Sequence, residues 1–293
     1  MDFIFNNLLE QLFPKVKDKS NISVLLYGGE PFLRNNLPAI NRIIAHTKKY
    51  QMKVSAISNS TQIHTMLDLF GNEVGLVNSI QASFDGGKSC HDKSRIGLDK
   101  QPTFECIMKN IHLLLDRRVR VGIRINIDKN SVPTIPNLLQ RLESEKILGH
   151  PLVKPYAWVI HSHYNQTKDN ALLSPIELAD YMEKKKVAIE TPVGRREKRL
   201  RAVFDAANGI PLKRTTFCMK CSDSSFVYDA YENIYGCYEE AGHPEKRVGH
   251  VDENGKVIFN EEYFTALTRH VASIEQCKKC SLALTCGGGC PFS

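Results

Sequence analysis

The amino-acid sequence predicts an α/β fold with a mostly parallel sheet, followed by a smaller cysteine-rich part. Short apolar segments alternate with longer amphipathic segments between residues 22 and 160, and several of the apolar segments end in polar or glycine-rich residues. Seven of the nine cysteines fall between Cys218 and Cys290. The chain has 293 residues, which is enough for one large domain or two ordinary ones.

Five apolar segments have the length and composition of strands, and the segments between them have helical spacing. The expected strands are 21–28, 52–58, 76–87, 119–128 and 151–160. The expected helices between them are 38–50, 60–71, 102–118 and 132–149. This alternation predicts parallel strands joined by right-handed crossovers, and both an open sheet and a barrel satisfy it.

Polar and flexible residues follow the first four expected strands. They are Gly28-Gly29-Glu30, Ser58-Asn59-Ser60, Ser83-Phe84-Asp85-Gly86 and Asn126-Ile127-Asp128. Each group alone is ordinary turn chemistry. The carboxyl ends of parallel strands meet at one edge of a sheet, however, and ligands bind at that edge in α/β folds. Four such groups together predict a cleft for a small molecule.

The first strand end, LLYGGEPFL at residues 25–33, places one carboxylate on a glycine-rich backbone. Gly28 and Gly29 lack a Cβ and allow a ligand to approach the backbone closely, and Pro31 stiffens the loop. Glu30 would then accept a hydrogen bond from a ligand ammonium group. The alternative is an ordinary turn in which Glu30 is a solvated loop carboxylate.

The composition changes after Ile160. The elements expected beyond it are a loop at 161–170, helices at 175–190 and 194–207, and hairpin-like strands around 225–238 and 250–259. We place a boundary near residues 209–213. The expected domains are therefore 1–160, a helical connection at 161–212, and 213–293.

The basic residues do not predict a nucleic-acid site. The net charge is +7, and the dense runs Lys184 to Lys186 and Arg195 to Arg201 lack interleaved aromatic residues. We interpret both runs as solvated helix faces, with an acidic peptide as the alternative partner. No apolar run has the length of a membrane span, and the start, MDFIFNNLLEQLF, lacks the basic region of a signal peptide. We therefore expect a cytoplasmic protein with no membrane partner.

The cysteines predict a metal centre. Their order is Cys218-x2-Cys221-x15-Cys237, followed by Cys277-x2-Cys280-x5-Cys286-x3-Cys290. Disulfides are not expected in a reducing compartment, whereas clustered thiolates beside glycines are typical of iron–sulfur sites. A zinc ribbon is the alternative, with ligands Cys218, Cys221, Cys277 and Cys280. It leaves three regularly spaced cysteines unused, whereas seven ligands fit two clusters with one position open.

The GGEP strand end, the S-x-D-G strand end and the cysteine tail together resemble radical S-adenosylmethionine enzymes with a SPASM domain, such as anaerobic sulfatase maturases and peptide maturases. The resemblance covers about Ser23 to Pro291. It implies a partial (β/α)6 TIM-like barrel without its first strand, followed by a small cysteine-rich SPASM domain. It also implies an oxidoreductase that cleaves S-adenosylmethionine to a 5′-deoxyadenosyl radical and modifies a peptide or protein. Its electron donor would be a protein such as flavodoxin or ferredoxin.

The resemblance also implies a set of site residues. The cofactor-binding residues would be Gly28, Gly29, Glu30, Pro31, Ser58, Asn59, Ser83, Asp85, Arg95 and Asn126. Among them, Glu30 would hold the methionyl ammonium group, and Arg95 of the HDKSR segment would pair with the methionyl carboxylate. One auxiliary [4Fe–4S] cluster would be bound by Cys218, Cys221, Cys237 and Cys290. A second would take three ligands from Cys277, Cys280 and Cys286.

Three departures from the family pattern stand out. No cysteine precedes Cys90, so the C-x3-C-x2-C motif that binds the reactive cluster is absent. The sequence stops at Ser293, where a later cysteine would complete the second cluster, and Tyr238 stands where sulfatase maturases have an aspartate. We therefore expect a maturase fragment that does not cleave S-adenosylmethionine alone. The alternative is a non-catalytic iron–sulfur or zinc protein that binds peptide, and no catalytic residue is assigned.

Overall fold

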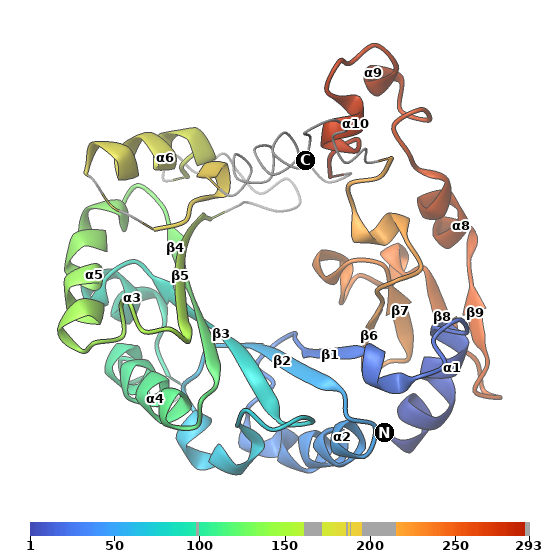
Figure 1. Cartoon of the computed structure of the whole chain (residues 1–293), viewed down its shortest axis with the longest axis horizontal. Helices are drawn as coiled ribbons and strands as arrows, with labels where there is room; N and C mark the ends of the chain where they lie inside the picture. The colour runs from blue at the N-terminus through green and yellow to red at the C-terminus, as the bar shows by residue number, and fades with distance from the viewer. Residues whose placement is uncertain (98–99, 161–171, 186, 188, 195–214, 291–293) are drawn as a thin grey trace. The chain divides into compact units, whose positions relative to one another are not determined.

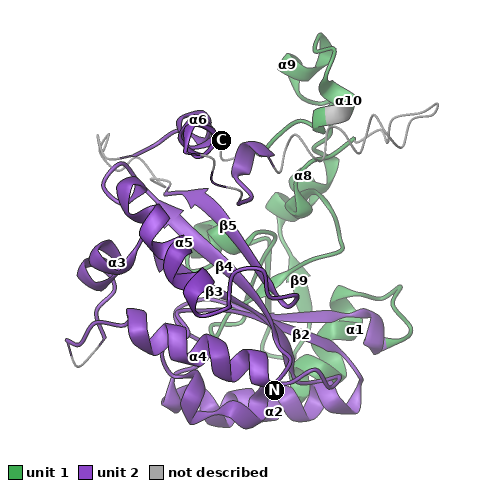
Figure 2. Ribbon diagram, turned by 60° about the vertical axis from the view of Figure 1, so that its left-hand side comes forward, with its two compact units in different colours: residues 1–18, 198–293 green, residues 19–197 purple. Residues whose placement is uncertain are grey.

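The computed structural model describes the chain except for residues 98–99, 161–171, 186, 188, 195–214 and 291–293. It forms two compact units (Figure 2): residues 19–197, here called the sheet unit, and residues 1–18 with residues 198–293, here called the cysteine unit. Several expected features lie outside the described residues: the loop at 161–170, the basic run at 195–201, most of the helix at 194–207, and the boundary at 209–213.

A five-stranded parallel sheet with the spatial order β1-β2-β3-β4-β5 forms the centre of the sheet unit. Its strands are β1 (Ser23–Leu26), β2 (Lys53–Ser58), β3 (Val77–Asp85), β4 (Arg120–Ile127) and β5 (Val153–Val159). The five predicted strands and the α/β class are confirmed. Because every pair is parallel, the carboxyl ends of all five strands lie at one edge of the sheet.

Helices α2, α4 and α5 lie on one side of this sheet (Figure 1). The helices of the unit are α2 (Leu37–Lys49), α3 (Lys88–Ser94), α4 (Phe104–Asp116), α5 (Ile135–Ser144) and α6 (Pro175–Lys184). Strand β4 shows how the two sides differ. Val121, Ile123 and Ile125 belong to the buried core, whereas Arg124 and Asn126, at alternating positions, are half-buried. The second side of β4 therefore carries polar side chains.

The predicted helix at residues 60–71 is wrong. The structure has two short 3-10 turns there, Ile63–Thr65 and Leu67–Leu69. Ser60 has a left-handed φ of 61°, and the Asn59 side chain accepts a hydrogen bond from the Thr61 backbone N–H at 2.9 Å. Such local side-chain bonds offer the backbone an alternative to a helix start. Helix α3 was not predicted at all.

Helix α6 is shorter than the predicted segment 175–190 and begins with a capping box. The Ser174 hydroxyl accepts from the Glu177 N–H at 3.1 Å, and the Glu177 carboxylate accepts from the Ser174 N–H at 2.7 Å. In its last turn Lys184 pairs with Asp180 at 2.7 Å on an exposed surface, which fits the prediction of a solvated face. Within the described part of the chain, no helix is both long and apolar enough to cross a membrane.

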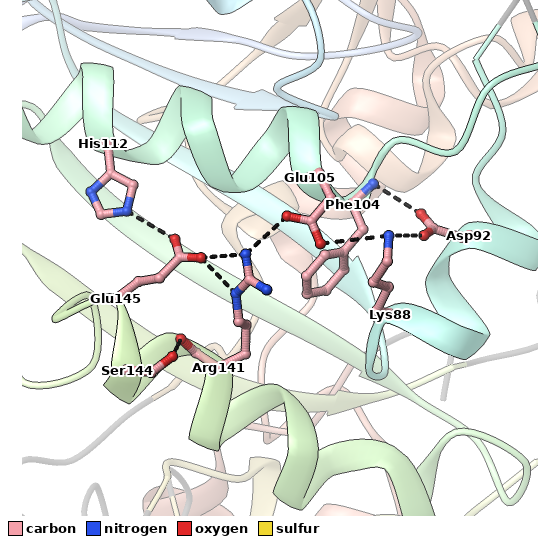
Figure 3. Close-up of polar contacts among 8 residues, drawn as sticks. All are labelled: Lys88, Asp92, Phe104, Glu105, His112, Arg141, Ser144 and Glu145. Carbon is pink, nitrogen blue, oxygen red and sulfur yellow. Dashed lines mark hydrogen bonds and ion pairs between the residues drawn. The ribbon is translucent and has the colours of Figure 1, made fainter.

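A network of charged side chains links α3, α4 and α5 (Figure 3). Lys88 of α3 lies 2.7 Å from Asp92 and 3.6 Å from Glu105 of α4. Arg141 of α5 contacts Glu105 at 2.9 Å and Glu145 at 2.5 Å, and His112 of α4 approaches Glu145 to 2.9 Å. The network ties the helix layer together on its outer surface.

The cysteine unit contains a four-stranded antiparallel sheet with the order β6-β7-β8-β9. Its strands are β6 (Val227–Tyr228), β7 (Asn233–Tyr235), β8 (Gly249–Val251) and β9 (Val257–Phe259). Its helices include α8 (Glu261–Thr268), α9 (Glu275–Lys278) and α10 (Ala283–Cys286). The expected hairpin-like strands are thus present.

The first residues of the chain also belong to the cysteine unit, whereas the sequence grouped them with the first-half strands. A π-helical turn, Ile4–Leu8, continues into α1 (Leu9–Leu12). Leu8 and Leu12 form a buried core with residues of β7 and β8. Gln11 donates to the Gly255 carbonyl and accepts from the Val257 N–H, both at 2.8 Å, so this segment is bonded to the start of β9.

Candidate functional site

Two glycines after β1 leave open space beside the backbone. Gly28 and Gly29 have φ values of 92° and 52°, which side chains other than glycine rarely adopt. A Cβ placed on either residue would meet no heavy atom within 4 Å. The space beside this backbone at the carboxyl end of the strand is therefore open.

The Glu30 carboxylate turns back toward the sheet and joins the ends of β1 and β2. Oε1 accepts from the Phe32 N–H at 3.0 Å and from the Ser58 hydroxyl at 2.7 Å, and Oε2 accepts from the Asn59 N–H at 2.5 Å. The loop is held in turn by Asn36, whose side-chain amide donates to the carbonyl of Glu30 at 3.1 Å and to that of Pro31 at 3.2 Å. Glu30 is thus a fixed acceptor, and the alternative of a freely solvated carboxylate is wrong.

A second polar group lies at the ends of β3 and β4. Asp85 and Asn126 are partners in the parallel register, and the Asn126 amide donates to Asp85 Oδ1 at 2.9 Å. Asp85 Oδ2 accepts from Arg95 Nε at 2.8 Å and from the Ser94 hydroxyl at 3.0 Å. Ser83, two residues earlier on β3, is 8% exposed. Asp85 therefore fixes the side chains of Arg95 and Asn126 at the carboxyl ends of β3 and β4.

The Asp85 carboxyl is held in its ionised form. Burial acts to raise its pKa, but hydrogen bonds from Arg95 and Asn126 and the charge of Arg95 outweigh this effect, so the pKa is lowered. Arg95, which we expected to pair with a ligand carboxylate, makes an ion pair with Asp85 through Nε. Its predicted role toward the ligand is not tested by this contact.

His91, the first residue of the HDKSR segment, has a supporting role that the sequence did not predict. It is fully buried; Nδ1 accepts from the Asp85 N–H at 3.2 Å, and Nε2 lies 3.0 Å from the Thr103 hydroxyl. That hydroxyl donates to the Arg95 carbonyl at 2.8 Å, so it accepts from Nε2–H. Burial, and secondly the charge of Arg95, lower the pKa of His91 to about 4. A neutral His91 thus fixes the backbone of both Asp85 and Arg95.

Arg124 and Trp158 extend the polar edge to β5, and neither was predicted. Arg124 Nε donates to Asn126 Oδ1 at 2.9 Å, and the guanidinium lies 5.7 Å from the centre of the Trp158 ring. Trp158 is the register partner of Asn126. The sequence does contain a signal for Arg124: it stands two positions before Asn126, and residues at i and i+2 of a strand lie on the same side of the sheet.

The predicted site residues at the strand ends are therefore brought together in two bonded groups, which we call the strand-end rim. One group contains Glu30, Ser58 and Asn59. The other contains Asp85, Arg95 and Asn126, with Ser83 beside it on β3. Both groups lie at the carboxyl edge of one parallel sheet, where a small ligand can contact several strand ends at once.

All nine cysteines are described, and none forms a disulfide. Cys218 precedes a 3-10 turn, Met219–Cys221, of which Cys221 is the last residue, and Cys237 follows β7. Burial raises the pKa of Cys221, and the neighbouring Cys218 thiol raises it further. Burial also raises the pKa of Cys237, the Glu239 backbone N–H lowers it, and Cys218 again raises it. Cys218 therefore influences the pKa of both other thiols.

The last four cysteines lie on successive turns. Cys277 lies in α9, Cys280 follows it, and Cys286 ends α10. Cys280 and Cys286 are exposed, and Cys277 and Cys290 are half-buried. The glycine turn before Cys290 is held by Arg269, whose guanidinium donates to the carbonyl oxygens of Gly288 at 3.0 Å and Gly289 at 3.2 Å.

Arg269 connects this turn with the first group of cysteines, because its guanidinium also acts on the Cys221 thiol and partly opposes the burial that raises the pKa of that thiol. The donor set of Cys218, Cys221 and Cys237, with the Cys290 turn tied to it, fits the thiolate chemistry of an iron–sulfur cluster. In the part of the chain that the structure describes, no three cysteine, histidine or acidic side chains are grouped so as to hold a single metal ion.

No family model matches the chain. It is 31% identical over 124 residues to an Fe-coproporphyrin III synthase of Methanosarcina barkeri, covering 42% of this chain and 29% of that protein. It is 24% identical to a cysteine-type anaerobic sulfatase-maturating enzyme of Clostridium novyi, covering 97% of this chain and 77% of that protein. The chain thus spans less than a third of the first relative.

Solved structures show the same fold. The enzyme anSMEcpe with bound AdoMet has a TM-score of 0.65 at 16% identity, covering 99% of this chain and 80% of that one. The SuiB structure from Streptococcus suis bound to S-adenosylmethionine has a TM-score of 0.57 at 14% identity, covering 92% and 61%. These two neighbours hold AdoMet or S-adenosylmethionine, and the resemblance to sulfatase maturases that the sequence predicts is confirmed.

Proposed function

We propose that this chain binds S-adenosylmethionine at the strand-end rim and belongs to a radical maturase that modifies a peptide or protein side chain. The observation that carries the proposal is the open glycine backbone of residues 28–29 beside the fixed carboxylate of Glu30. One solved neighbour holds AdoMet together with the Cp18Cys peptide, and another holds the precursor peptide SuiA, which supports a peptide partner.

The rim residues divide the work of binding. Gly28, Gly29 and Pro31 shape the loop, and Glu30 accepts from the methionyl ammonium group. Ser58 and Asn59 hold Glu30 and would contact the ribose. S-adenosylmethionine, when bound beside a reduced cluster, supplies the radical that removes a hydrogen from the substrate. The protein positions the cofactor and excludes water.

The second group of rim residues binds and orients the other end of the cofactor. Asp85 holds Arg95, and Arg95 in turn pairs with the methionyl carboxylate. Ser83 and Asn126 complete the polar edge between these groups. The sheet unit would then be the partial (β/α)6 barrel of the family.

The cysteine unit would be a SPASM domain with up to two auxiliary [4Fe–4S] clusters. Cys218, Cys221, Cys237 and Cys290 would bind one, and Cys277, Cys280 and Cys286 would supply three ligands to the other. Exposed thiols such as Cys280 and Cys286 suit a reducing cytoplasm, and a flavodoxin or ferredoxin would deliver electrons. We propose no nucleic-acid or membrane partner.

The cofactor site is tested by binding. We expect Glu30→Gln to weaken S-adenosylmethionine binding about tenfold or more, because a charged acceptor of the ammonium group is lost. Isothermal titration of the full chain measures the affinity, and thermal unfolding shows whether the loop stays folded. Glu73→Gln is the matched control, since Glu73 is an exposed carboxylate of the same unit. Equal affinities of a folded Glu30→Gln variant and the wild type would refute the site.

The rival function is a non-catalytic iron–sulfur or zinc protein that binds peptide. No cysteine precedes Cys90, so these 293 residues hold no C-x3-C-x2-C motif. We expect this chain alone to bind S-adenosylmethionine without producing 5′-deoxyadenosine under dithionite. Iron and sulfide analysis after anaerobic reconstitution separates iron–sulfur proteins from zinc proteins, and cofactor binding separates the maturase proposal from a peptide-binding module.

A further inference from the structure

One buried ion pair connects two cysteine-bearing turns of the cysteine unit. Lys220, which lies between Cys218 and Cys221, is only 7% exposed. Its Nζ lies 2.6 Å from Oε1 of Glu240. Glu240 is fully buried and follows Cys237 by three residues. The pair therefore joins the turn of the first two cysteines to the turn of the third.

The stem of Lys220 packs directly on the second turn. A Cβ on Gly236, the residue before Cys237, would lie 2.6 Å from Lys220 Cγ and would clash. Only glycine admits the lysine stem at this distance. Lys220 is held from a third direction by Glu262 of α8, at 2.8 Å.

Stability alone does not explain this pair. Two buried charges lose much of their hydration energy, and apolar residues of the same volume are often as stable or more stable. Among the described residues, moreover, Glu240 Oε2 is a buried oxygen without a hydrogen-bond partner. The pair fixes the distance and orientation between the two turns, because a short charged hydrogen bond has a defined geometry. An apolar contact would leave that distance adjustable.

We propose that the Lys220–Glu240 ion pair positions Cys218, Cys221 and Cys237 as ligands of one iron–sulfur cluster. This inference rests on the proposed function, since it requires that these thiols bind a cluster. Each turn is closed locally by its own backbone bond, from the Cys221 N–H to the Cys218 carbonyl at 3.1 Å and from the Glu240 N–H to the Cys237 carbonyl at 3.2 Å. The ion pair fixes the position of the Cys218–Cys221 turn relative to the Cys237–Glu240 turn.

The test replaces the pair by apolar residues of similar volume. The full chain carries Cys277→Ser, Cys280→Ser and Cys286→Ser, so that only the first cluster is counted, with or without Lys220→Met and Glu240→Leu together. Both proteins are reconstituted anaerobically with iron and sulfide. Three quantities are measured: iron and sulfide per chain, the rate of iron release to an excess of chelator, and the unfolding midpoint of the cluster-free protein.

We expect the double substitution of Lys220 and Glu240 to leave the unfolding midpoint of the cluster-free protein nearly unchanged. It should speed iron release roughly 10- to 100-fold, as outer-shell substitutions do at metal sites. Iron release at the parent rate from the folded double variant would overturn the inference while leaving the cluster proposal intact. A triple-serine parent without iron would instead overturn the cluster assignment and the inference together.

A second variant covers the case in which the double variant does not fold. Glu240→Gln keeps the shape of the side chain and one acceptor for Lys220 but removes the charge. We expect it to release iron faster than the triple-serine parent and more slowly than the double variant. Lys15→Met is the matched control, because the Lys15–Asp223 pair of the same unit is long, 3.5 Å, and exposed. It should release iron at the parent rate. If the Glu240→Gln variant released iron as slowly as the Lys15→Met variant, the positioning role of the ion pair would be refuted.

Discussion

At the residue scale, the strand-end rim consists of side chains that are bonded to one another across neighbouring strands. Glu30 is held by Ser58 and Asn59, and Asp85 by Arg95 and Asn126. Acceptors fixed in this way lose little freedom when a ligand binds, which favours affinity. The sequence predicted most rim residues because they stand at the ends of parallel strands, and it predicted Arg95 from the resemblance of the HDKSR segment.

His91 shows what the sequence could not predict at this scale. Its partners, the Asp85 N–H and the Thr103 hydroxyl, lie 6 and 12 residues away, and the S-x-D-G and HDKSR motifs do not show that these groups are bonded to His91. The same holds for Arg124, whose contact with Trp158 joins residues of two strands. Such contacts depend on how the sheet is assembled, and a motif describes only the residues that touch the ligand.

His91 makes a prediction about pH. Its pKa is about 4 in the folded protein, against an ordinary value of 6.5, so between these values the unfolded state binds the proton and the folded state does not. Stability should therefore be full above pH 6.5 and fall as the pH decreases. From pH 6.5 to pH 5 the free energy of unfolding should drop by about 1.6 kcal/mol, because the slope increases from about 0.7 kcal/mol per unit at pH 6.5, where half of the unfolded state is protonated, toward about 1.4 kcal/mol per unit.

The measurement is urea unfolding of the wild type and His91→Gln at pH 6.5 and pH 5. The variant should be less stable at both values, since two buried hydrogen bonds change, but it should lack the pH-dependent loss. His64→Gln, in an exposed position of the same unit, is the control and should behave like the wild type. An equal loss in wild type and His91→Gln would contradict the assignment of a neutral His91.

At the scale of elements, alternation of apolar and polar residues determined what could be predicted. The prediction of strand β4 is correct because its valine and isoleucines alternate with Arg124 and Asn126. The segment 60–71 also has apolar residues at helical spacing, yet it forms 3-10 turns because the Asn59 side chain bonds the backbone where a helix would start. Periodicity describes burial, whereas local hydrogen bonds decide which turn forms.

The helix layer makes a second prediction, on Glu145. Burial acts to raise its pKa, but hydrogen bonds from His112 and Arg141 lower it overall, so the ionised form is stabilised (Figure 3). We expect Glu145→Gln to lower the free energy of unfolding by about 1 kcal/mol at neutral pH, the upper range for pairs near the surface. The effect should shrink in 1 M salt, where charges are screened.

Asp180→Asn is the matched control, because its pair with Lys184 is a single exposed contact within one helix. Urea unfolding at low and high salt compares the two variants. A Glu145→Gln loss that does not depend on salt would show that the side chain acts through packing and that the ionic network between the helices contributes nothing.

At the scale of the whole molecule, the division into units does not follow chain order. The sequence indicated a first half of strands and helices and a cysteine-rich second half, and both exist. It gave no sign that the segment before β1 packs on the antiparallel sheet of the other unit. Leu8 and Leu12 have helical spacing that fits either sheet, and the sequence does not show that they pack against β7 and β8 or that Gln11 bonds Gly255 and Val257.

This placement predicts that a residue near the start of the chain stabilises the fold of the cysteine unit and protects its buried Cys221 thiol. Leu8 is 1% exposed in the core that it shares with Ile234 and Val248. Leu8→Ala should lower the stability of this unit by about 2–5 kcal/mol, the usual cost of such a cavity. The thiol of Cys221, which is 7% exposed, should then react faster with a thiol reagent.

Leu9→Ala is the control, since Leu9 is half-buried and not part of that core, and its effect on Cys221 labelling should be much smaller. The fluorescence of Trp158, the one tryptophan of the chain, reports on the sheet unit in the same samples. Because a core substitution opens first the structure that surrounds it, Leu8→Ala should speed Cys221 labelling at urea concentrations that leave the Trp158 signal unchanged. Labelling at the wild-type rate would show that the first helix does not support the cysteine unit in solution.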